Sequence, residues 1–253
     1  MVDIHTFVLP NFSKGPKDKD TFIHIAKMLV KQGVTHAVAT PTINSEVSVE
    51  TKEGILNQID IVNRYLTELS IPLKILPGQK VRSSRQILNL YTESLTINDT
   101  SKYLMIDLTE EDFIAQLEDI IYKMQLKEIV PIISEPEMCF FILDNPQKLY
   151  QFVKNGAIIQ LSAASILGQN GRKAKRAAFQ FIEHGLAHVI ASGVTAQTFN
   201  TYGLQRAYDV LFKRYGSRTV YMLKENAESI IRGEALIKER PERIKQAKFL
   251  GIF

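Results

Sequence analysis

The sequence predicts a single-domain α/β protein built on a parallel β-barrel. Strand and helix patterns alternate along most of the chain, and seven β-then-α units follow one another. No Gly-x-Gly-x-x-Gly turn or phosphate loop marks a doubly wound nucleotide fold. The 253 residues, 45% of them hydrophobic, can form one such domain with a large core. Because we find no linker, low-complexity segment or fixed-period repeat, we expect one domain over residues 1–253.

The first half of the chain begins with a strand that carries an acid and an imidazole. Side chains alternate over residues 2–7, so Asp3 and His5 share one face with Phe7. The elements expected next are a helix with apolar residues at 22, 25, 29 and 30 that ends near Gly33, a strand over 34–40, a helix from about 49 to 69, and a strand over 73–76. Residues 41–47 are expected to form a loop, and residues 87–95 are ambiguous.

The second half of the chain repeats this alternation. A buried strand over 103–106 ends at Asp107 and precedes a helix with apolar residues at 113, 117, 120, 121 and 124. The remaining elements are a strand over 128–133, a short helix from Pro146, a strand over 156–161, a helix over 173–184, a strand over 187–191, and two helices between about 201 and 232.

Composition narrows the classes of function. The net charge of +4 is only mildly basic and no basic stripe is interleaved with aromatic residues, so nucleic acid is not an expected partner. No stretch reaches the roughly 18 apolar residues of a membrane helix, the first residues do not form a basic-then-apolar signal sequence, and a lone Cys139 suits a reducing compartment. We therefore expect a cytoplasmic protein.

The segment 237–253 interleaves basic and apolar residues. This pattern suits a C-terminal arm that contacts an acidic partner or, peripherally, an anionic membrane surface. The alternative is a solvated tail or one that caps the domain.

Polar side chains gather where the predicted strands end, which is where a parallel barrel places its chemistry. The residues at these ends are His5, Phe7, Pro41, Thr42, Gln79, Lys80, Asp107, Glu135, Ser162, Gly193 and Thr195.

Ordered landmarks over nearly the whole chain carry a family resemblance. They are Asp3-Ile4-His5 with Leu9-Pro10, Gln32-Gly33, Ala39-Thr40-Pro41, Leu76-Pro77-Gly78-Gln79, Gln125-Leu126-Lys127, Pro136-Glu137, Ile182-Glu183-His184, Ile190-Ala191-Ser192 and Lys224-Glu225-Asn226-Ala227-Glu228. The set resembles the bacterial capsular and exopolysaccharide protein-tyrosine phosphatases of the CpsB/YwqE type, in the polymerase-and-histidinol-phosphatase (PHP) superfamily. The resemblance implies a distorted (β/α)7 TIM-like barrel. It also implies a cluster of divalent metal ions, often manganese, that binds phosphate and activates a water.

The chain departs from the family pattern at most of the metal-ligand positions. The replaced ligands are Phe7, Thr42, Lys80, Gly193 and Thr195, while Asp107 stands for a glutamate, Glu135 for a histidine and Met138 for an arginine. His5, Asp107 and Glu135 remain as candidate ligands, enough for at most one metal ion, so we expect no metal cluster. We hypothesise that the ammonium of Lys80 replaces the metals as the counter-ion of Asp107 or Glu135.

Two classes of function follow from the resemblance and its departures. The first is a catalytically impaired relative of manganese-dependent protein-tyrosine phosphatases that regulates capsule or exopolysaccharide biosynthesis by binding a tyrosine kinase or a polysaccharide-assembly protein. The alternative is a phosphatase that still hydrolyses phosphotyrosine through a reduced site. For single residues, the favoured interpretations are His5 as a hydrogen-bonded barrel histidine and Phe7 as interior packing. Less favoured are a pocket in which Lys80 binds phosphate and an acid–base pair of Asp107 and Glu135.

Overall fold

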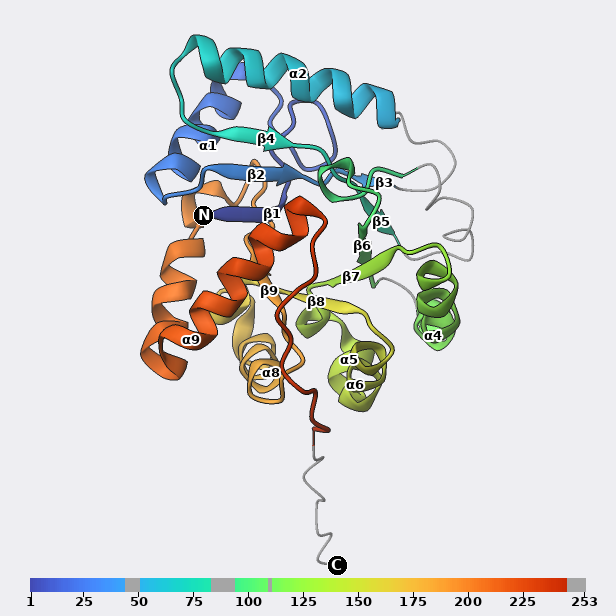
Figure 1. Ribbon diagram of the computed structural model, residues 1–253. Helices are drawn as coiled ribbons and strands as arrows, with labels where there is room; N and C mark the ends of the chain where they lie inside the picture. Colours follow the sequence, from blue (N-terminus) through green and yellow to red (C-terminus); the bar gives the residue numbers. More distant parts are fainter. Residues whose placement is uncertain (44–50, 83–93, 109–110, 245–253) are drawn as a thin grey trace, which may run out of the picture.

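The computed structural model describes residues 1–43, 51–82, 94–108 and 111–244. All strand pairs in this part of the chain are parallel, and they form two sheets (Figure 1). One sheet has the order β1 (Val2–Thr6), β2 (His36–Ala39), β4 (Lys74–Leu76). The other has the order β3 (Thr42–Ile43), β5 (Lys80–Arg82), β6 (Tyr103–Asp107), β7 (Val130–Ser134), β8 (Ile158–Ser162), β9 (Val189–Ala191). The predicted α/β fold with a parallel sheet is confirmed.

Two strands are interrupted where the chain passes from one sheet to the other. β2 is followed by β3 and β4 by β5, with Pro41 and Pro77 in the breaks. Proline has no N–H to donate to a neighbouring strand, so the strand pairing is interrupted at both positions. The loop predicted over 41–47 is wrong at Thr42–Ile43, which pair with β5. The rest of that loop and residues 87–93 of the ambiguous segment lie outside the described residues.

Backbone hydrogen bonds join the first strand to the last. Phe7 N donates to Val194 O (2.8 Å), Gly193 N donates to His5 O (2.9 Å), and Thr6 pairs with Val194 in a parallel bridge. The end of β9 therefore lies beside β1, as a barrel requires. A closed barrel of seven units and one domain over the whole chain stay predictions.

Amphipathic helices cover the sheets (Figure 1). They are α1 (Lys19–Lys31), α2 (Lys52–Glu68), α4 (Glu111–Gln125), α5 (Phe140–Asp144), α6 (Pro146–Lys154), α7 (Ala163–Leu167), α8 (Gly171–Glu183) and α9 (Leu204–Arg232). Short 3₁₀ turns lie at η2 (Ile97–Asp99), η3 (Pro136–Met138) and η4 (Phe199–Thr201). Gly216 has a φ of 80° inside α9 and divides it, which confirms the two helices predicted there.

The C-terminal segment packs against the domain as far as residue 244. The Asn226 side-chain amide donates to Ile237 O (2.9 Å) and accepts from Ile237 N (2.8 Å), and Gln147 Nε2 donates to Ile244 O (2.7 Å). Ile244 is 2% exposed. Residues 237–244 therefore behave as the capping alternative expects, and residues 245–253 of the predicted arm lie outside the described part.

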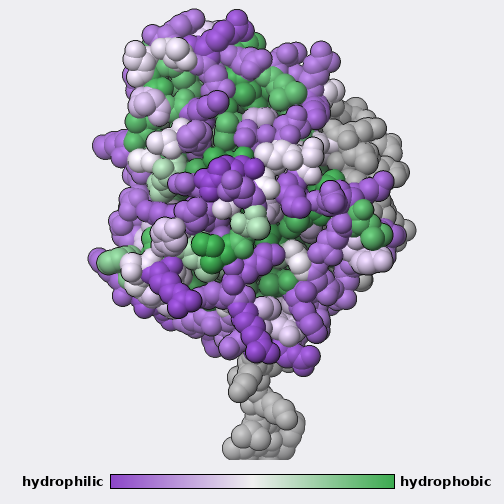
Figure 2. Space-filling model, in the orientation of Figure 1, coloured by the Kyte–Doolittle hydropathy of each residue, from purple (hydrophilic) through white to green (hydrophobic). Residues whose placement is uncertain are grey.

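This segment, dark red in Figure 1, runs from the end of α9 toward α8, α5 and α6. Figure 2 shows that the same face is mainly hydrophilic, with hydrophobic residues in separate patches. Within the described ranges, no helix combines the length and apolar character needed to cross a membrane.

We expect Ile244→Ala to lower the free energy of unfolding by about 2–4 kcal/mol, because it removes a fully buried side chain and leaves a cavity. Ile237→Ala is the matched control, since Ile237 is 46% exposed and its backbone bonds to Asn226 remain. Urea unfolding monitored by circular dichroism measures both changes. Equal losses in the two variants would contradict the packed position of Ile244.

Candidate functional site

Residues from the carboxyl ends of several strands lie at one edge of the sheets. His5 lies in β1 and Phe7 directly after it, Lys80 lies between the end of β4 and the rest of β5, Asp107 ends β6, and Glu135 follows β7. Gly193, two residues beyond the end of β9, completes the edge. Because the strands are parallel, their carboxyl ends bring together residues that are far apart in the sequence.

His5 is completely buried and neutral. Its Nδ1 lies 2.5 Å from Thr40 Oγ1, and that hydroxyl in turn donates to Thr6 O (3.3 Å). The Thr40 oxygen can therefore accept from Nδ1–H, which leaves Nε2 with a lone pair and without a partner among the described residues. Burial first, and then the positive charges of Lys80 and Lys14, lower the pKa of His5 well below its usual value.

Phe7 lies between the histidine and two ammonium groups. Its ring centroid is 5.0 Å from that of His5 at an angle of 66°. Nζ of Lys14 and Nζ of Lys80 each lie 5.3 Å from the Phe7 centroid. The face of an aromatic ring attracts a cation at this range. Phe7 is buried, with 5% of it exposed, as the predicted interior packing requires. Its ring also contacts the two positive charges.

Lys80 forms an ion pair with Asp107. The Nζ–Oδ2 distance is 3.5 Å, and the side chains are 4% and 24% exposed. A buried ammonium without a carboxylate would be costly, so the pair satisfies Lys80 at the position where the resemblance expects a metal ligand. The predicted pairing of Lys80 is confirmed for Asp107.

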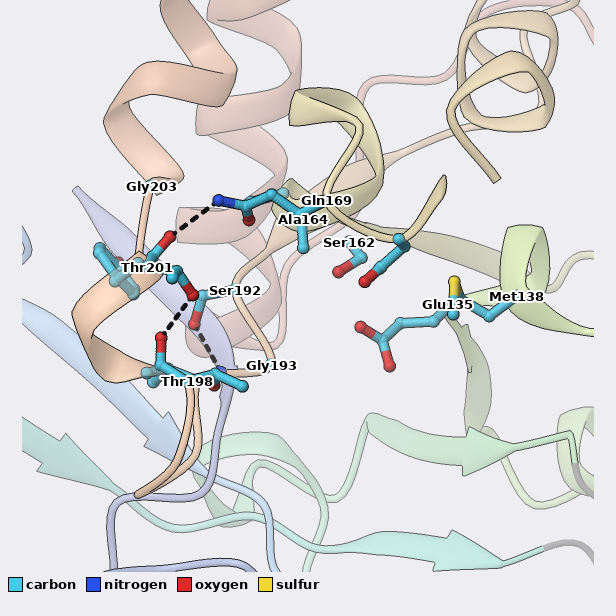
Figure 3. Close-up of a pocket in the computed structure, with 14 residues that line it drawn as sticks. Glu135, Met138, Ser162, Ala164, Gln169, Ser192, Gly193, Thr198, Thr201 and Gly203 are labelled. Atoms are coloured by element: carbon cyan, nitrogen blue, oxygen red, sulfur yellow. Dashed lines mark hydrogen bonds between the residues drawn. The ribbon is translucent and has the colours of Figure 1, made fainter. Parts of the chain in front are cut away.

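Glu135 extends into a cavity of about 510 Å³ that Met138, Ser162, Ser192 and Gly193 help to line (Figure 3). Its backbone has a φ of 50°, in the left-handed region that costs a non-glycine residue energy. A β-carbon built at Gly193 would lie 3.1 Å from Glu135 Oε1 and 3.7 Å from His5 Cδ2. A larger residue at 193 would therefore displace Glu135.

The two threonines predicted as replaced ligands differ in position. Thr42 is the register partner of Lys80 in the parallel β3–β5 pair, so its side chain lies on the same face of the sheet as that of Lys80. Thr195 Oγ1 lies 3.1 Å from Thr198 Oγ1 and accepts from the N–H groups of Gln197 and Thr198 (both 3.2 Å). Thr195 thus stabilises the turn that follows β9.

Three titratable residues of the site were not predicted as functional. Lys14 lies in the loop between β1 and α1, eight residues beyond the end of β1, so no local signal marked it. Asp3 is buried, and its carboxylate accepts hydrogen bonds from Ser192 N (3.0 Å) and Tyr202 OH (3.2 Å). Burial raises the pKa of Asp3 to about 6. Glu137 Oε1 accepts from Ser162 N (2.8 Å). Burial, with a smaller contribution from Glu135, raises the pKa of Glu137 to about 8.

The residues present do not fit a cluster of metal ions. In the described part of the chain, no three His, Cys, Asp or Glu side chains lie together as a ligand group, so His5, Asp107 and Glu135 are not brought together as one. The Nε2 atom of His5 could bind a metal ion. Asp107, however, is paired with Lys80, and the ammonium groups of Lys14 and Lys80 would repel a divalent cation.

The chain belongs to the CpsB/CapC family of capsular polysaccharide synthesis, whose model matches residues 1–232. It is 32% identical to the tyrosine-protein phosphatase YwqE of Bacillus subtilis over the full length of both chains. It is 28% identical to CapC of Staphylococcus aureus, again over both full lengths. It is also 23% identical to the tyrosine-protein phosphatase CpsB of Streptococcus pneumoniae, over 86% of this chain and 92% of that protein.

Solved structures agree with this assignment. The chain superposes with a TM-score of 0.90 and 31% identity on a structure described among those of YwqE from Bacillus subtilis and CpsB from Streptococcus pneumoniae, "unique metal-dependent tyrosine phosphatases". The match covers 97% of this chain and 100% of that one. Dihydropyrimidinase from Brevibacillus agri, at 9% identity and a TM-score of 0.53, shares the fold alone.

We expect Asp107→Asn to lower the free energy of unfolding by about 1–3 kcal/mol, because it leaves the buried Lys80 ammonium without its carboxylate. The double variant Lys80→Met/Asp107→Asn should recover most of this loss, since both charges are then absent. Urea unfolding of wild type, both single variants and the double variant gives the coupling energy. Additive single effects would show that the ion pair contributes nothing.

Glu137 should make stability depend on pH. Between about pH 5 and 8 the folded chain keeps a proton that the unfolded chain loses, so the free energy of unfolding should fall as pH rises, with a slope approaching about 1.4 kcal/mol per pH unit. Glu137→Gln mimics the protonated carboxyl and should remove this contribution. Unfolding curves of both proteins at pH 5, 6, 7 and 8 measure it; parallel pH dependences would refute the raised pKa.

Proposed function

We propose that this chain serves phosphotyrosine-dependent control of capsular polysaccharide synthesis and acts on a tyrosine-phosphorylated protein, such as a tyrosine kinase or a polysaccharide-assembly protein. The observation that carries the proposal is similarity to tyrosine-protein phosphatases over the full length of both chains. We also propose a cytoplasmic location, which the lone Cys139 suits.

Hydrolysis of phosphotyrosine is the candidate that the comparisons favour. The similar proteins are named tyrosine-protein phosphatases, and the superposed structure is described as that of a metal-dependent one. The candidate ligands expected from the sequence, for at most one ion such as manganese, are His5, Asp107 and Glu135, which the described part of the structure does not bring together as a ligand group. Asp107 would first have to release Lys80, to which it is bound at 3.5 Å.

Phosphotyrosine binding with impaired hydrolysis is the candidate that the described side chains favour. Lys14 is exposed and Lys80 is buried, and both ammonium groups lie beside Phe7. Lysines can attract a phosphoryl dianion as point charges. With Lys80 at an expected metal-ligand position and Lys14 beside it, the site can retain an anion but has no evident means of producing hydroxide at neutral pH.

One experiment separates the two candidates. The metal content of the purified protein is measured, and then binding and hydrolysis of a phosphotyrosine peptide are followed with manganese and with a chelator. Turnover that needs manganese and is abolished by His5→Ala supports the phosphatase. Binding in chelator without turnover supports the impaired relative. If the peptide neither binds nor reacts, the proposed function is wrong.

We expect Lys14→Ala to weaken phosphotyrosine-peptide binding in chelator about 5–20-fold, which corresponds to loss of one charge-assisted contact of about 1–2 kcal/mol. Lys17→Ala is the matched control, because Lys17 is an exposed lysine of the same loop. Isothermal titration calorimetry measures both affinities. Equal affinities for the two variants would exclude Lys14 from the phosphate site.

A further inference from the structure

We propose that the basic face of α8 is a docking surface for an acidic segment of the phosphotyrosine-bearing partner. This face consists of Arg172, Lys173, Lys175 and Arg176, all exposed. The identity of the partner rests on the proposed function, whereas the affinity for an acidic segment rests on the face itself.

The four cations lie within five positions of one helix and repel one another. Arg172 is three residues from Lys175 and four from Arg176, and Lys173 is three from Arg176. Like charges at these spacings destabilise a helix. In the described part of the chain, none of the four forms an ion pair. The repulsion is therefore not cancelled by a direct ion pair, although Lys175 lies over the ring of Phe179 (5.9 Å to the centroid).

The cations also lie at the positive end of the helix dipole. α8 has no acidic residue in its first turn, and the side chain of Asn170 donates to Ser165 Oγ (3.0 Å) without capping the helix. By contrast, α1 begins with Asp18, whose carboxylate accepts from Thr21 N (2.7 Å), and has Asp20 in its first turn. Cations at a helix N-terminus cost stability, so an anion bound here would relieve both unfavourable interactions.

Apolar residues connect the candidate site to this face. Met138, which is 50% exposed, lines the cavity into which Glu135 extends, and its 3₁₀ turn η3 packs against α8. Phe140, which is 70% exposed, then lines a groove of about 360 Å³ with Lys173 and Arg176. A peptide held at the cavity can therefore pass over Met138 and Phe140 and reach the cations.

The grooves beside α8 favour a peptide over a continuous polyanion. Asp144 lines the groove with Phe140, and Glu183 lines a second groove of about 510 Å³ with Arg172 and Lys175. Glu183 is already paired with Arg214 (2.8 Å), so Asp144 is the carboxylate that would repel the evenly spaced phosphates of a nucleic acid here. A peptide can place its acidic residues opposite the cations and an apolar residue on Phe140.

The test compares two phosphotyrosine peptides that differ only in their flank, which is either rich in Asp and Glu or carries Asn and Gln at the same positions. We expect the acidic peptide to bind at least about 10-fold more tightly at low salt and to lose this advantage at high salt. Lys173→Ala/Arg176→Ala should remove most of the difference. Lys27→Ala/Lys31→Ala, which removes two exposed lysines of α1, should leave it unchanged.

Equal affinities for the two flanks would overturn the docking proposal, as would tighter binding of this face to phosphatidylserine vesicles or a DNA duplex. An unphosphorylated acidic peptide separates this proposal from the proposed function. If that peptide binds as well as its phosphorylated form and depends on Lys173 and Arg176, the docking surface stands and the phosphotyrosine function fails. If phosphotyrosine strengthens binding and the flank has no effect, the function stands and the docking surface fails.

Discussion

The candidate site depends on one constraint: a positive charge buried at the strand ends must be compensated. Lys80 is 4% exposed and is held by Asp107 at 3.5 Å and by the face of Phe7. Burial first, and then the same positive charge, lower the pKa of His5 and favour the neutral imidazole. One ammonium thus pairs with the carboxylate of Asp107, repels a divalent cation and adds to the effect of burial on the histidine.

The same edge retains features that suit a functional site. Glu135 has a left-handed backbone, and its carboxylate lies close to Gly193. His5 Nε2 has no partner among the described residues, and the contact of Nδ1 with Thr40 orients the ring. Strained backbone and oriented imidazoles cluster at functional sites.

Sequence patterns were sufficient to predict the long helices, because a long helix forms where an apolar stripe of matching spacing can be buried. The α1 stripe at Phe22, Ile25 and Leu29 is buried as its spacing predicts, and Gly216 divides α9 as expected. Patterns failed at Thr42–Ile43 and Lys80–Arg82. Strands of two or three residues are too short to show alternation, and they form because β3 pairs with β5 and β5 pairs with β6.

The sequence by itself determined the family, the parallel α/β class and the strand ends at which His5, Lys80, Asp107 and Glu135 would lie, because parallel strands bring their carboxyl ends to one edge. Only the tertiary structure decided that Lys80 pairs with Asp107 and leaves Glu135 to the cavity. It also decided that Lys14 reaches Phe7 and that Glu137 is buried beside Glu135. Those outcomes depend on distances between segments remote in sequence, and local patterns carry no information about such distances.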